Sequence, residues 1–347
     1  MHFASDNWAG ASPEIADAIA VEAARRGAAY GGSDIDRQVE ERFSGIFERE
    51  VAVYFVATGS AANGLAMSAV NRPGGIVFCH RDCHMVEGEC GGVEFLTGGA
   101  RLFELGGADG KFDHATLRSA IAALTPASEH HGRPMAVSIT QQTEAGTAYT
   151  LAEIERIAEV ARTYDLPFHM DGARFANALV ELDASPAAMS WKAGVDMLSF
   201  GATKNGCVAA EAVIFFDPER AHEMPFLRKR AGQLFSKSRF VAAQFDAYLR
   251  DGLWLDNARH ANTMADRLRA GLAASPVARE AWPTGGNEIF AVLRQDDAAR
   301  LSAAGAEFHP WTRGGDAPLE EGEILLRLVT AFSTQADDVD AFLKALG

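Results

Sequence analysis

The sequence has 347 residues, enough for two domains or for one large domain with a smaller one attached. Apolar residues make up 48% of the chain and charged residues 23%, as in ordinary soluble globular proteins. The formal charge of −15 argues against broad attraction to nucleic acid or to an anionic membrane, but it leaves room for a local basic pocket that binds a small anion.

The start of the chain and its cysteines bear on where the protein works. The opening MHFASDNWAGASPEI has no basic segment leading into an apolar core, so it does not read as a secretory signal. No apolar run approaches the length of a membrane span. The four cysteines, at positions 79, 83, 90 and 207, contain no CxxC pair, which favours reduced thiols over a metal cluster. We therefore expect a cytoplasmic protein without a metal site.

The first half of the chain alternates helical patterns with apolar runs. Residues 12–27 begin with a serine and a proline and end in glycine, which predicts a helix. Residues 51–59 predict a buried strand that leads into a helix over 60–70, and residues 135–140 predict a further strand. Residues 150–164 combine a Thr150–Glu153 capping box with apolar positions at helical spacing, which predicts another helix.

The second half continues the alternation and then changes in character. Strands are predicted over 166–171, 195–201 and 210–216, followed by a long charged amphipathic helix over 253–274. Shorter strands near 287–293 and 323–329 and a helix over 333–346 close the chain. The alternation indicates an α/β fold with a mostly parallel sheet. We expect a large domain over residues 1–245 and a smaller α/β domain over residues 246–347.

Two polar segments follow strands of this predicted sheet, at the carboxyl ends where α/β proteins usually bind ligands. In ATGSAANG (57–64), a glycine and a serine open a helix whose free N–H groups and dipole would hold a phosphate, although Gly-Ser is also ordinary turn chemistry. The GK[ST] ending of a P-loop is missing. In FHMDGARF (168–175), Asp171 ends an apolar strand and is either a helix cap or the partner of a buried cation.

The third segment contains Lys204, in SFGATKNG (199–206). A lone lysine in a loop is usually solvated, but this one follows a buried run and is flanked by small residues. A lysine in a tight pocket can form a Schiff base. A phosphate cradle, an aspartate for a pyridinium nitrogen and a lysine for an aldehyde together describe a site for pyridoxal 5′-phosphate (PLP).

With these motifs the sequence resembles the L-threonine aldolases, PLP enzymes of the aspartate-aminotransferase fold (fold type I) in the β-eliminating lyase group. The resemblance runs nearly end to end, through FASDN, AYGG, ATGSAAN, CHMVEGECGG, QQTEAGT, HMDGARFANA, SWKAGVDMLSFGATKNG, KRAGQLFSKSRF and LLRLVT. FASDN and GATKNG are similar to the low-specificity branch that accepts phenylserine. The resemblance implies retro-aldol cleavage of L-threonine, L-allo-threonine and related β-hydroxy-α-amino acids to glycine and an aldehyde.

The resemblance also implies roles for individual residues at the cofactor. Lys204 would form the Schiff base with PLP, and Asp171 would pair with the pyridinium nitrogen. His84 would stack on the ring and is a candidate base for the substrate hydroxyl. Gly59 and Ser60 would bind the phosphate, although many relatives have threonine where this sequence has Ser60.

Further residues are implied at the substrate. Ser5, Arg174 and Arg327 would hold the substrate carboxylate, and Arg174 would also lie against the cofactor. Pocket or subunit-boundary positions are implied for Tyr30, Glu89 and Lys229. The family resemblance implies a homo-oligomer, a dimer or a homotetramer, with the active site at the subunit boundary, and no nucleic-acid or membrane partner.

Two other interpretations remain open from the sequence. An aminotransferase or a lyase that eliminates a β-substituent would share the residues at the cofactor, so only His84 and the overall likeness favour an aldolase. A non-catalytic α/β protein that binds a phosphorylated ligand would leave Lys204 without a role. The preferred substrate, the threo or erythro preference and the physiological direction are not determined by the sequence.

Overall fold

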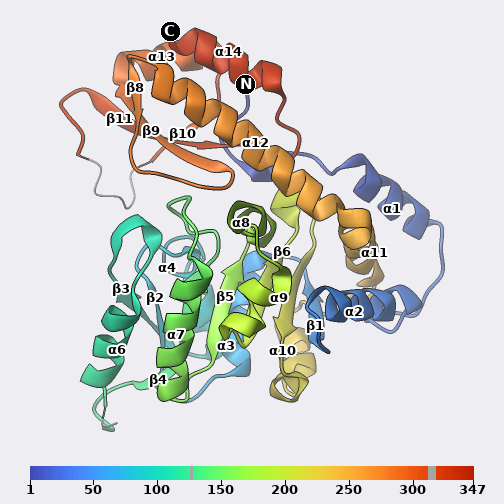
Figure 1. Cartoon of the computed structure of the whole chain (residues 1–347). Coiled ribbons are helices and arrows are strands. Elements are labelled where there is room, and N and C mark those ends of the chain that lie inside the picture. Colours follow the sequence, from blue (N-terminus) through green and yellow to red (C-terminus); the bar gives the residue numbers. More distant parts are fainter. Residues whose placement is uncertain (126–127, 312–317) are drawn as a thin grey trace.

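The computed structural model describes residues 1–125, 128–311 and 318–347. Two β-sheets organise the chain: a large sheet with helices on both faces, and a smaller sheet that lies above one edge of it (Figure 1). The predicted α/β fold with a mostly parallel sheet is confirmed, because four of the six strand pairings in the large sheet are parallel.

The large sheet has the strand order β1-β7-β6-β5-β4-β2-β3. Its strands are β1 (Ala52–Val56), β2 (Gly75–His80), β3 (Arg101–Leu105), β4 (Arg133–Thr140), β5 (Phe168–Gly172), β6 (Met197–Gly201) and β7 (Glu211–Phe215). β7 runs antiparallel to both of its neighbours, so it starts at the edge where β1 and β6 end. Glu211, the first residue of β7, is therefore paired in register with Val56 and Gly201.

Helices cover both faces of this sheet because each presents an apolar side to it. One face packs against helices that share the larger core cluster: α1 (Pro13–Ala23), α2 (Asp34–Ile46), α6 (His114–Ala123), α7 (Leu151–Thr163), α8 (Phe175–Leu182), α9 (Pro186–Met189) and α11 (Arg239–Leu249). The other face packs against α3 (Gly59–Ala69), α4 (His84–Glu87), α5 (Gly92–Thr97) and α10 (Met224–Arg230).

The sequence signals for helix starts are confirmed with small differences. Thr150 and Glu153 form the expected capping box of α7. Ser12 precedes α1 but makes no side-chain cap, and the helix ends at Ala23, before the glycine expected to close it. Thr58, one residue earlier than expected, caps α3 by accepting a hydrogen bond from the backbone N–H of Ala61. The cap therefore lies directly at the end of β1.

An aromatic cluster fixes the end of β6 that leads to Lys204. The ring of Phe200 is fully buried and lies 5.2 Å from that of Phe43 and 5.6 Å from that of Phe175, centroid to centroid. It also lies 5.8 Å from the ring of Trp254, which belongs to the helix that follows α11. Large buried aromatic side chains contribute strongly to core stability. The backbone just before Lys204 is thus held from three helices.

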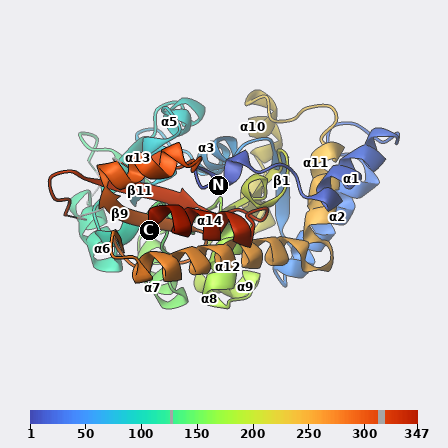
Figure 2. The same cartoon turned by 90° about the horizontal axis from the view of Figure 1, so that it is seen from above.

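The smaller sheet has the order β10-β11-β9-β8 and is antiparallel throughout. It consists of β8 (Ala278–Glu280), β9 (Glu288–Arg294), β10 (His309–Pro310) and β11 (Glu323–Val329). One face is covered by α12 (Leu253–Ala274), α13 (Gln295–Ala303) and α14 (Ala336–Leu346). From above, α12 crosses the whole molecule toward α11 and α1 (Figure 2).

The first residues of the chain pack with this smaller sheet rather than with the large one. Phe3 exchanges backbone hydrogen bonds with Glu307 and Val329, and its ring lies 5.2 Å from that of Phe342. The N-terminal segment then descends to the edge of the large sheet, where it forms the short 3-10 helix η1 (Asp6–Trp8). The start of the chain can therefore reach the strand ends of the large sheet.

The domain boundary predicted at residue 245 lies inside α11, whose Phe245 belongs to the core of the large sheet. The division into two domains stays a prediction.

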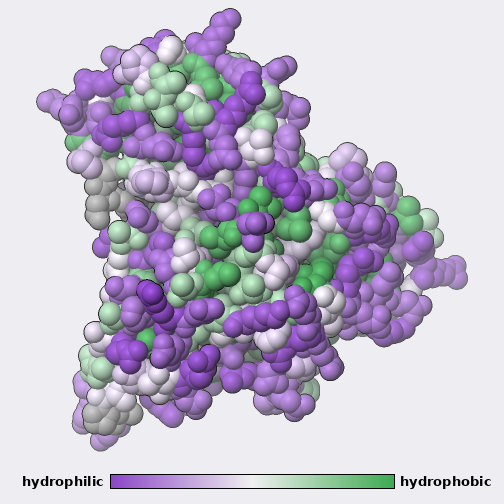
Figure 3. All heavy atoms as spheres, in the orientation of Figure 1, coloured by the Kyte–Doolittle hydropathy of each residue, from purple (hydrophilic) through white to green (hydrophobic). Residues whose placement is uncertain are grey.

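Apolar side chains gather on one face of the molecule near the place where α12 crosses α8, and hydrophilic ones cover most of the rest of that face (Figure 3). Within the described residues, no helix combines the length and the apolar character needed to cross a bilayer.

Candidate active site

A cavity of about 250 Å³ lies at the carboxyl edge of the large sheet. It brings together segments that are far apart in the sequence: the start of α3, the ends of β5 and β6, the start of β7, and parts of α4 and η1. Its lining residues are Asn7, Ala57, Thr58, Gly59, Ser60, Asn63, His84, Asp171, Ala173, Thr203, Lys204 and Glu211. Five of the predicted site residues therefore share one cavity: Gly59, Ser60, His84, Asp171 and Lys204.

The start of α3 forms one wall of the cavity. Gly59 and Ser60 are the first two residues of the helix, and the backbone N–H groups of a first helical turn have no partner within the helix. Thr58 Oγ1 uses its lone pair for the N–H of Ala61, 3.2 Å away. Ala57 N–H donates to Gln233 Oε1 at 3.0 Å, which ties this wall to the segment after α10. Free N–H groups and the helix dipole suit this wall for a phosphate.

Asp171 lies on the opposite side, within β5, and is nearly inaccessible to solvent. Asn63 Nδ2 donates to Asp171 Oδ2 at 2.8 Å, and the backbone N–H of Ala173 donates to Oδ1 at 3.0 Å. The alternative interpretation as a helix cap is wrong, because α8 starts at Phe175 and Arg174 occupies its N-cap position. Both carboxylate oxygens are therefore held in place while the group faces the cavity.

Lys204 belongs to the 3-10 helix η4 (Thr203–Asn205), which follows β6. Two features hold this segment against the sheet. Gly201 permits close contact, since a Cβ atom there would lie 2.7 Å from the backbone oxygen of Ala173. Asn205 Nδ2 donates to the Tyr248 hydroxyl at 2.7 Å and to the Trp254 carbonyl at 2.8 Å. Small residues before Lys204 thus allow the backbone of this segment to pack closely against the end of β5.

His84 opens α4 and is held by a carboxylate and by a glycine. Its Nδ1 lies 3.0 Å from Oε1 of the buried Glu89, which also accepts a hydrogen bond from Asn63 Nδ2. The imidazole occupies space that a side chain at Gly88 would need, because a Cβ atom there would lie 2.8 Å from Nε2. The hydrogen bond that His84 donates to Glu89 raises the pKa of His84 more than partial burial lowers it. Glu89 therefore acts on His84 rather than lining the cavity itself.

Arg174 is buried beside the cavity and is paired with two carboxylates. Its Nε and Nη2 donate to the two oxygens of Asp6 at 2.8 and 3.0 Å. Its Nη1 lies 3.1 Å from Oε2 of Glu288 on β9. Burial alone would lower the pKa of Arg174, but the two carboxylates raise it, so the guanidinium stays charged. Arg174 is separated from Asp171 by Gly172, the last residue of β5, and by Ala173 in a turn, so the two residues do not share a helix.

The two carboxyl groups that contact Arg174 have pKa values shifted in opposite directions. Burial would raise the pKa of Asp6, but Arg174 and Lys204 lower it overall. Burial raises the pKa of Glu288 more than Arg174 and Arg327 lower it. Asp6 accepts two hydrogen bonds from Arg174, whereas Glu288 makes a single contact with it. An additional anion that binds Arg174 would therefore displace Glu288 more easily than Asp6.

Two further residues expected at the substrate lie near this cluster, and two lie elsewhere. Ser5 precedes Asp6 and caps η1 through Asn7. Arg327 lies within β11, where Nη2 donates to the Ala4 carbonyl at 3.4 Å and the guanidinium lies 5.0 Å from the ring centre of Trp311. Tyr30 is half exposed and carries the ammonium of Lys229 over its ring at 5.1 Å. The monomer does not bring Tyr30 or Lys229 to the lining of the cavity.

Sequence reasoning missed several residues of the site. Asn63 stands in the quoted ATGSAANG, one turn after the helix start, and could have been found from that spacing. Glu211 is a charged residue at the head of an apolar run, which is an unusual place for a carboxylate. Glu288 likewise stands at the head of an apolar run, whereas Asp6 and Gln233 have no comparable local signal, because their partners come from distant parts of the chain.

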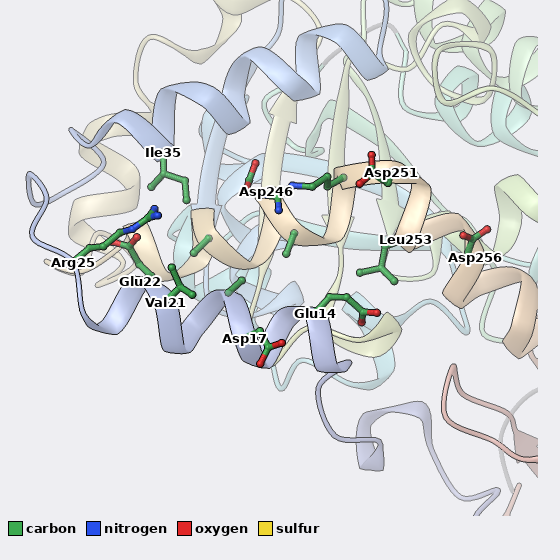
Figure 4. Close-up of a pocket in the computed structure, with 14 residues that line it drawn as sticks. Glu14, Asp17, Val21, Glu22, Arg25, Ile35, Asp246, Asp251, Leu253 and Asp256 are labelled. Atoms are coloured by element: carbon green, nitrogen blue, oxygen red, sulfur yellow. Dashed lines mark hydrogen bonds and ion pairs between the residues drawn. The ribbon is translucent and has the colours of Figure 1, made fainter.

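A second cavity, of about 610 Å³, lies away from the strand ends, between α1, α11 and the start of α12 (Figure 4). Most of its charged lining residues are acidic: Glu14, Asp17, Glu22, Asp246, Asp251 and Asp256. Such a lining disfavours a phosphate. The smaller cavity, which has an amine, a fixed carboxylate and a helix N-terminus, fits PLP.

Comparisons with known proteins find relatives along most of the chain. Residues 2–295 match the model of the beta-eliminating lyase family. A low-specificity L-threonine aldolase of Pseudomonas aeruginosa is 38% identical over 317 residues, which cover 91% of each chain. A second low-specificity L-threonine aldolase, from a Pseudomonas species, is 37% identical over 319 residues and covers 91% of each chain.

Solved structures also superpose on this chain. A threonine aldolase of Leishmania major superposes with a TM-score of 0.92 at 29% identity and covers 99% of this chain and 98% of its own. A TDC of Oryza sativa, solved with PLP and tryptamine, superposes with a TM-score of 0.74 at 13% identity, covering 99% of this chain and 83% of its own. At that identity the second likeness concerns the fold alone.

Glu89→Gln tests the electrostatic role of Glu89 at His84. An amide cannot stabilise the imidazolium, so we expect the pKa of His84 to fall, as measured by NMR titration of its ring signals. Glu144 also raises the pKa of His84, but without a hydrogen bond. Glu144→Gln should therefore lower it less, and equal shifts in the two variants would contradict the assigned role of Glu89.

Proposed function

Because this chain belongs to the beta-eliminating lyase family, we propose that it is a PLP-dependent aldolase that cleaves β-hydroxy-α-amino acids. L-threonine, L-allo-threonine and phenylserine would yield glycine and an aldehyde by breaking the Cα–Cβ bond. The observation that carries the proposal is the placement of Lys204, Asp171 and His84 around one cavity at the strand ends. The family assignment and the relatives named above make the chain a PLP-dependent carbon–carbon lyase.

Different residues of the cavity would bind different groups of the cofactor. Lys204 would hold PLP through its amino group, Gly59 and Ser60 would hold the phosphate, and Asp171 would face the pyridine nitrogen. When bound, PLP supplies a ring that withdraws the electrons released at the substrate Cα. Asn63 and Ala173 keep the Asp171 carboxylate in position through their hydrogen bonds.

His84 is the residue that would move a proton. Glu89 binds its Nδ1, so Nε2 is the ring nitrogen that would accept the proton of the substrate β-hydroxyl. Loss of that proton allows the Cα–Cβ bond to break with release of an aldehyde. Glu89 holds the ring at one orientation, and Gly88 leaves the space that the ring occupies. Orientation of this kind is a large part of what an active site contributes.

The substrate carboxylate would bind at Arg174, with Ser5 and Arg327 beside it. Arg174 is a buried cation two residues beyond the end of β5, and its planar guanidinium can hold a carboxylate by two parallel bonds. Because Glu288 is the more weakly held of its two partners, the incoming carboxylate would take the place of Glu288 at Nη1. Fixing the carboxylate selects which bond at Cα is broken.

The second proposal concerns assembly: we infer a homo-oligomer, a dimer or a tetramer, with Tyr30 and Lys229 near the boundary between subunits. Support comes from large apolar side chains left exposed on the single chain, at Phe95 and Phe226 above all, which are 84% and 67% exposed. Phe95 on α5 and Leu227 on α10 line one groove of the surface. Exposed apolar patches of this kind are typical of interfaces.

Lys204→Ala tests the function. We expect loss of turnover of L-threonine and of the visible absorbance of the bound cofactor, with an unchanged circular dichroism spectrum, because no other amine lines the cavity among the described residues. Lys192→Ala, which removes an exposed lysine paired with Glu48, is the matched control. Wild-type absorbance and glycine production in the Lys204 variant would refute the proposal, and keto acid in place of glycine from the wild type would indicate an aminotransferase.

Arg174→Lys tests the carboxylate site. Lysine keeps the charge but lacks the planar fork, so we expect kcat/KM to fall by a factor of roughly ten to a hundred, on the order of 1.5–3 kcal/mol for one charge-assisted bond. Transamination to the keto acid should rise, because the bond to be broken is held less well. Arg267→Lys, at an exposed bidentate pair with Asp340, is the control. Unchanged efficiency would place Arg174 outside the carboxylate site.

Phe95→Asp tests assembly. A charge in the centre of an apolar interface should shift the wild-type oligomer toward monomer in sedimentation and lower the activity at the same time. Val21→Asp, at a half-exposed position on α1, is the control. A wild-type chain that sediments as a fully active monomer would exclude the oligomer.

A further inference from the structure

Glu211 is a buried carboxyl group that the proposed reaction does not use. It is 7% exposed and lines the same cavity as Lys204 and the start of α3. It lies there because β7 is antiparallel to β1 and β6, so that its first residue meets the ends of both neighbours. A carboxylate at such a place is costly unless it is paired or neutral.

The group lies against the wall assigned to the phosphate. Its Oε2 would lie 3.8 Å from a Cβ atom on Gly59, the first residue of α3. Its Oε1 accepts a long hydrogen bond of 3.4 Å from the N–H of Thr203. Glu211 therefore sits between the helix N-terminus and the segment that carries Lys204.

The lining of the cavity offers little positive charge to offset two anions. Among the described residues that line it, Lys204 is the one lysine, and no arginine takes part. Lys204 is assigned to the aldehyde of the cofactor rather than to its phosphate. A phosphate dianion and an ionised Glu211 at the same wall would repel each other in a buried site.

We propose that Glu211 is protonated when the cofactor phosphate is bound, and that its carboxyl O–H donates a hydrogen bond to a phosphate oxygen. The proton comes from solvent, so binding of the phosphate takes up one proton at Glu211. The inference rests on the assignment of PLP to this cavity. It makes Glu211 a residue that sets how tightly the cofactor is held as the pH changes.

The electrostatics around Glu211 agree with this geometry. Burial raises the pKa of Glu211 to about 7 even though Thr203 and Lys204 favour its ionised form, and Asp171 raises it further. Two other groups interact with Glu211, namely Cys207 and, on α11, Tyr248; burial raises the pKa of each well above its ordinary value. Both stay neutral near pH 7, so of these three groups Glu211 is the one that titrates there.

The sign of the pH effect follows from linkage. A phosphate that requires the protonated acid binds tightest below the pKa of Glu211 in the empty site. Above about pH 7, the dissociation constant should rise by up to roughly tenfold per pH unit. Glu211→Gln supplies an N–H donor without a titrating proton, so this part of the pH dependence should disappear.

The test uses the full chain freed of cofactor, with pyridoxine 5′-phosphate as the probe, because it has no aldehyde to react with Lys204. Calorimetry in buffers of different ionisation enthalpy counts the protons taken up on binding. Pyridoxine without phosphate is the matched ligand, since any protonation of the pyridine nitrogen beside Asp171 is common to both. We expect the wild-type chain to take up one more proton with the phosphorylated probe above about pH 7.

Two variants complete the experiment. Glu211→Gln should remove the extra proton and flatten the pH dependence of binding. Glu40→Gln changes another carboxyl group whose pKa is raised by burial, but one outside the cavity, and should leave both unchanged. Equal proton uptake with the two ligands in the wild-type chain would overturn the proposal for Glu211 while leaving the PLP site intact. Failure of pyridoxine 5′-phosphate to bind at all would overturn both.

Discussion

A positive charge buried between the two sheets has to be matched, and Arg174 is matched by carboxylates from two distant parts of the chain. Asp6 comes from the N-terminal segment and Glu288 from β9, and Asn287 Nδ2 links Asp6 to the Thr330 carbonyl. Removing one partner of a buried pair typically costs about 3–5 kcal/mol because the other charge is left unpaired. The position of the smaller sheet above the large one therefore depends on the same guanidinium that would orient the substrate.

The direction of β7 determines which group faces the cavity wall that is formed by the start of α3. If β7 were parallel to its neighbours, its first residue would lie at the far edge of the large sheet and Glu211 would not meet the start of α3. Because β7 is antiparallel, a carboxyl group faces the place where a phosphate would bind. The cavity thus joins a helix dipole that attracts anions with an acid that repels them when ionised. The protonation of Glu211 is what would reconcile the two.

The part of the site that could be predicted from the sequence consists of residues with strong local signals. Gly59, Asp171 and Lys204 each follow an apolar run, and the ends of neighbouring strands meet at one edge of a sheet. The structure brings these three to one cavity. Arg174 could be named from the sequence but its partners could not, because Asp6 and Glu288 come from distant parts of the chain. Asn63 had a local signal that the motif reading left unused.

Local pattern by itself determined the α/β class, the positions of the main strands and helices, and the strand ends that carry the cofactor residues, because these depend on periodicity and caps within a few residues. Only the tertiary structure decided which distant residues meet there. The reversal of β7, the contact of Asp6 and Glu288 with Arg174, and the hydrogen bond of Gln233 to Ala57 all join segments widely separated in the chain. Such contacts arise from the packing of whole sheets and helices, so short-range sequence patterns do not predict them.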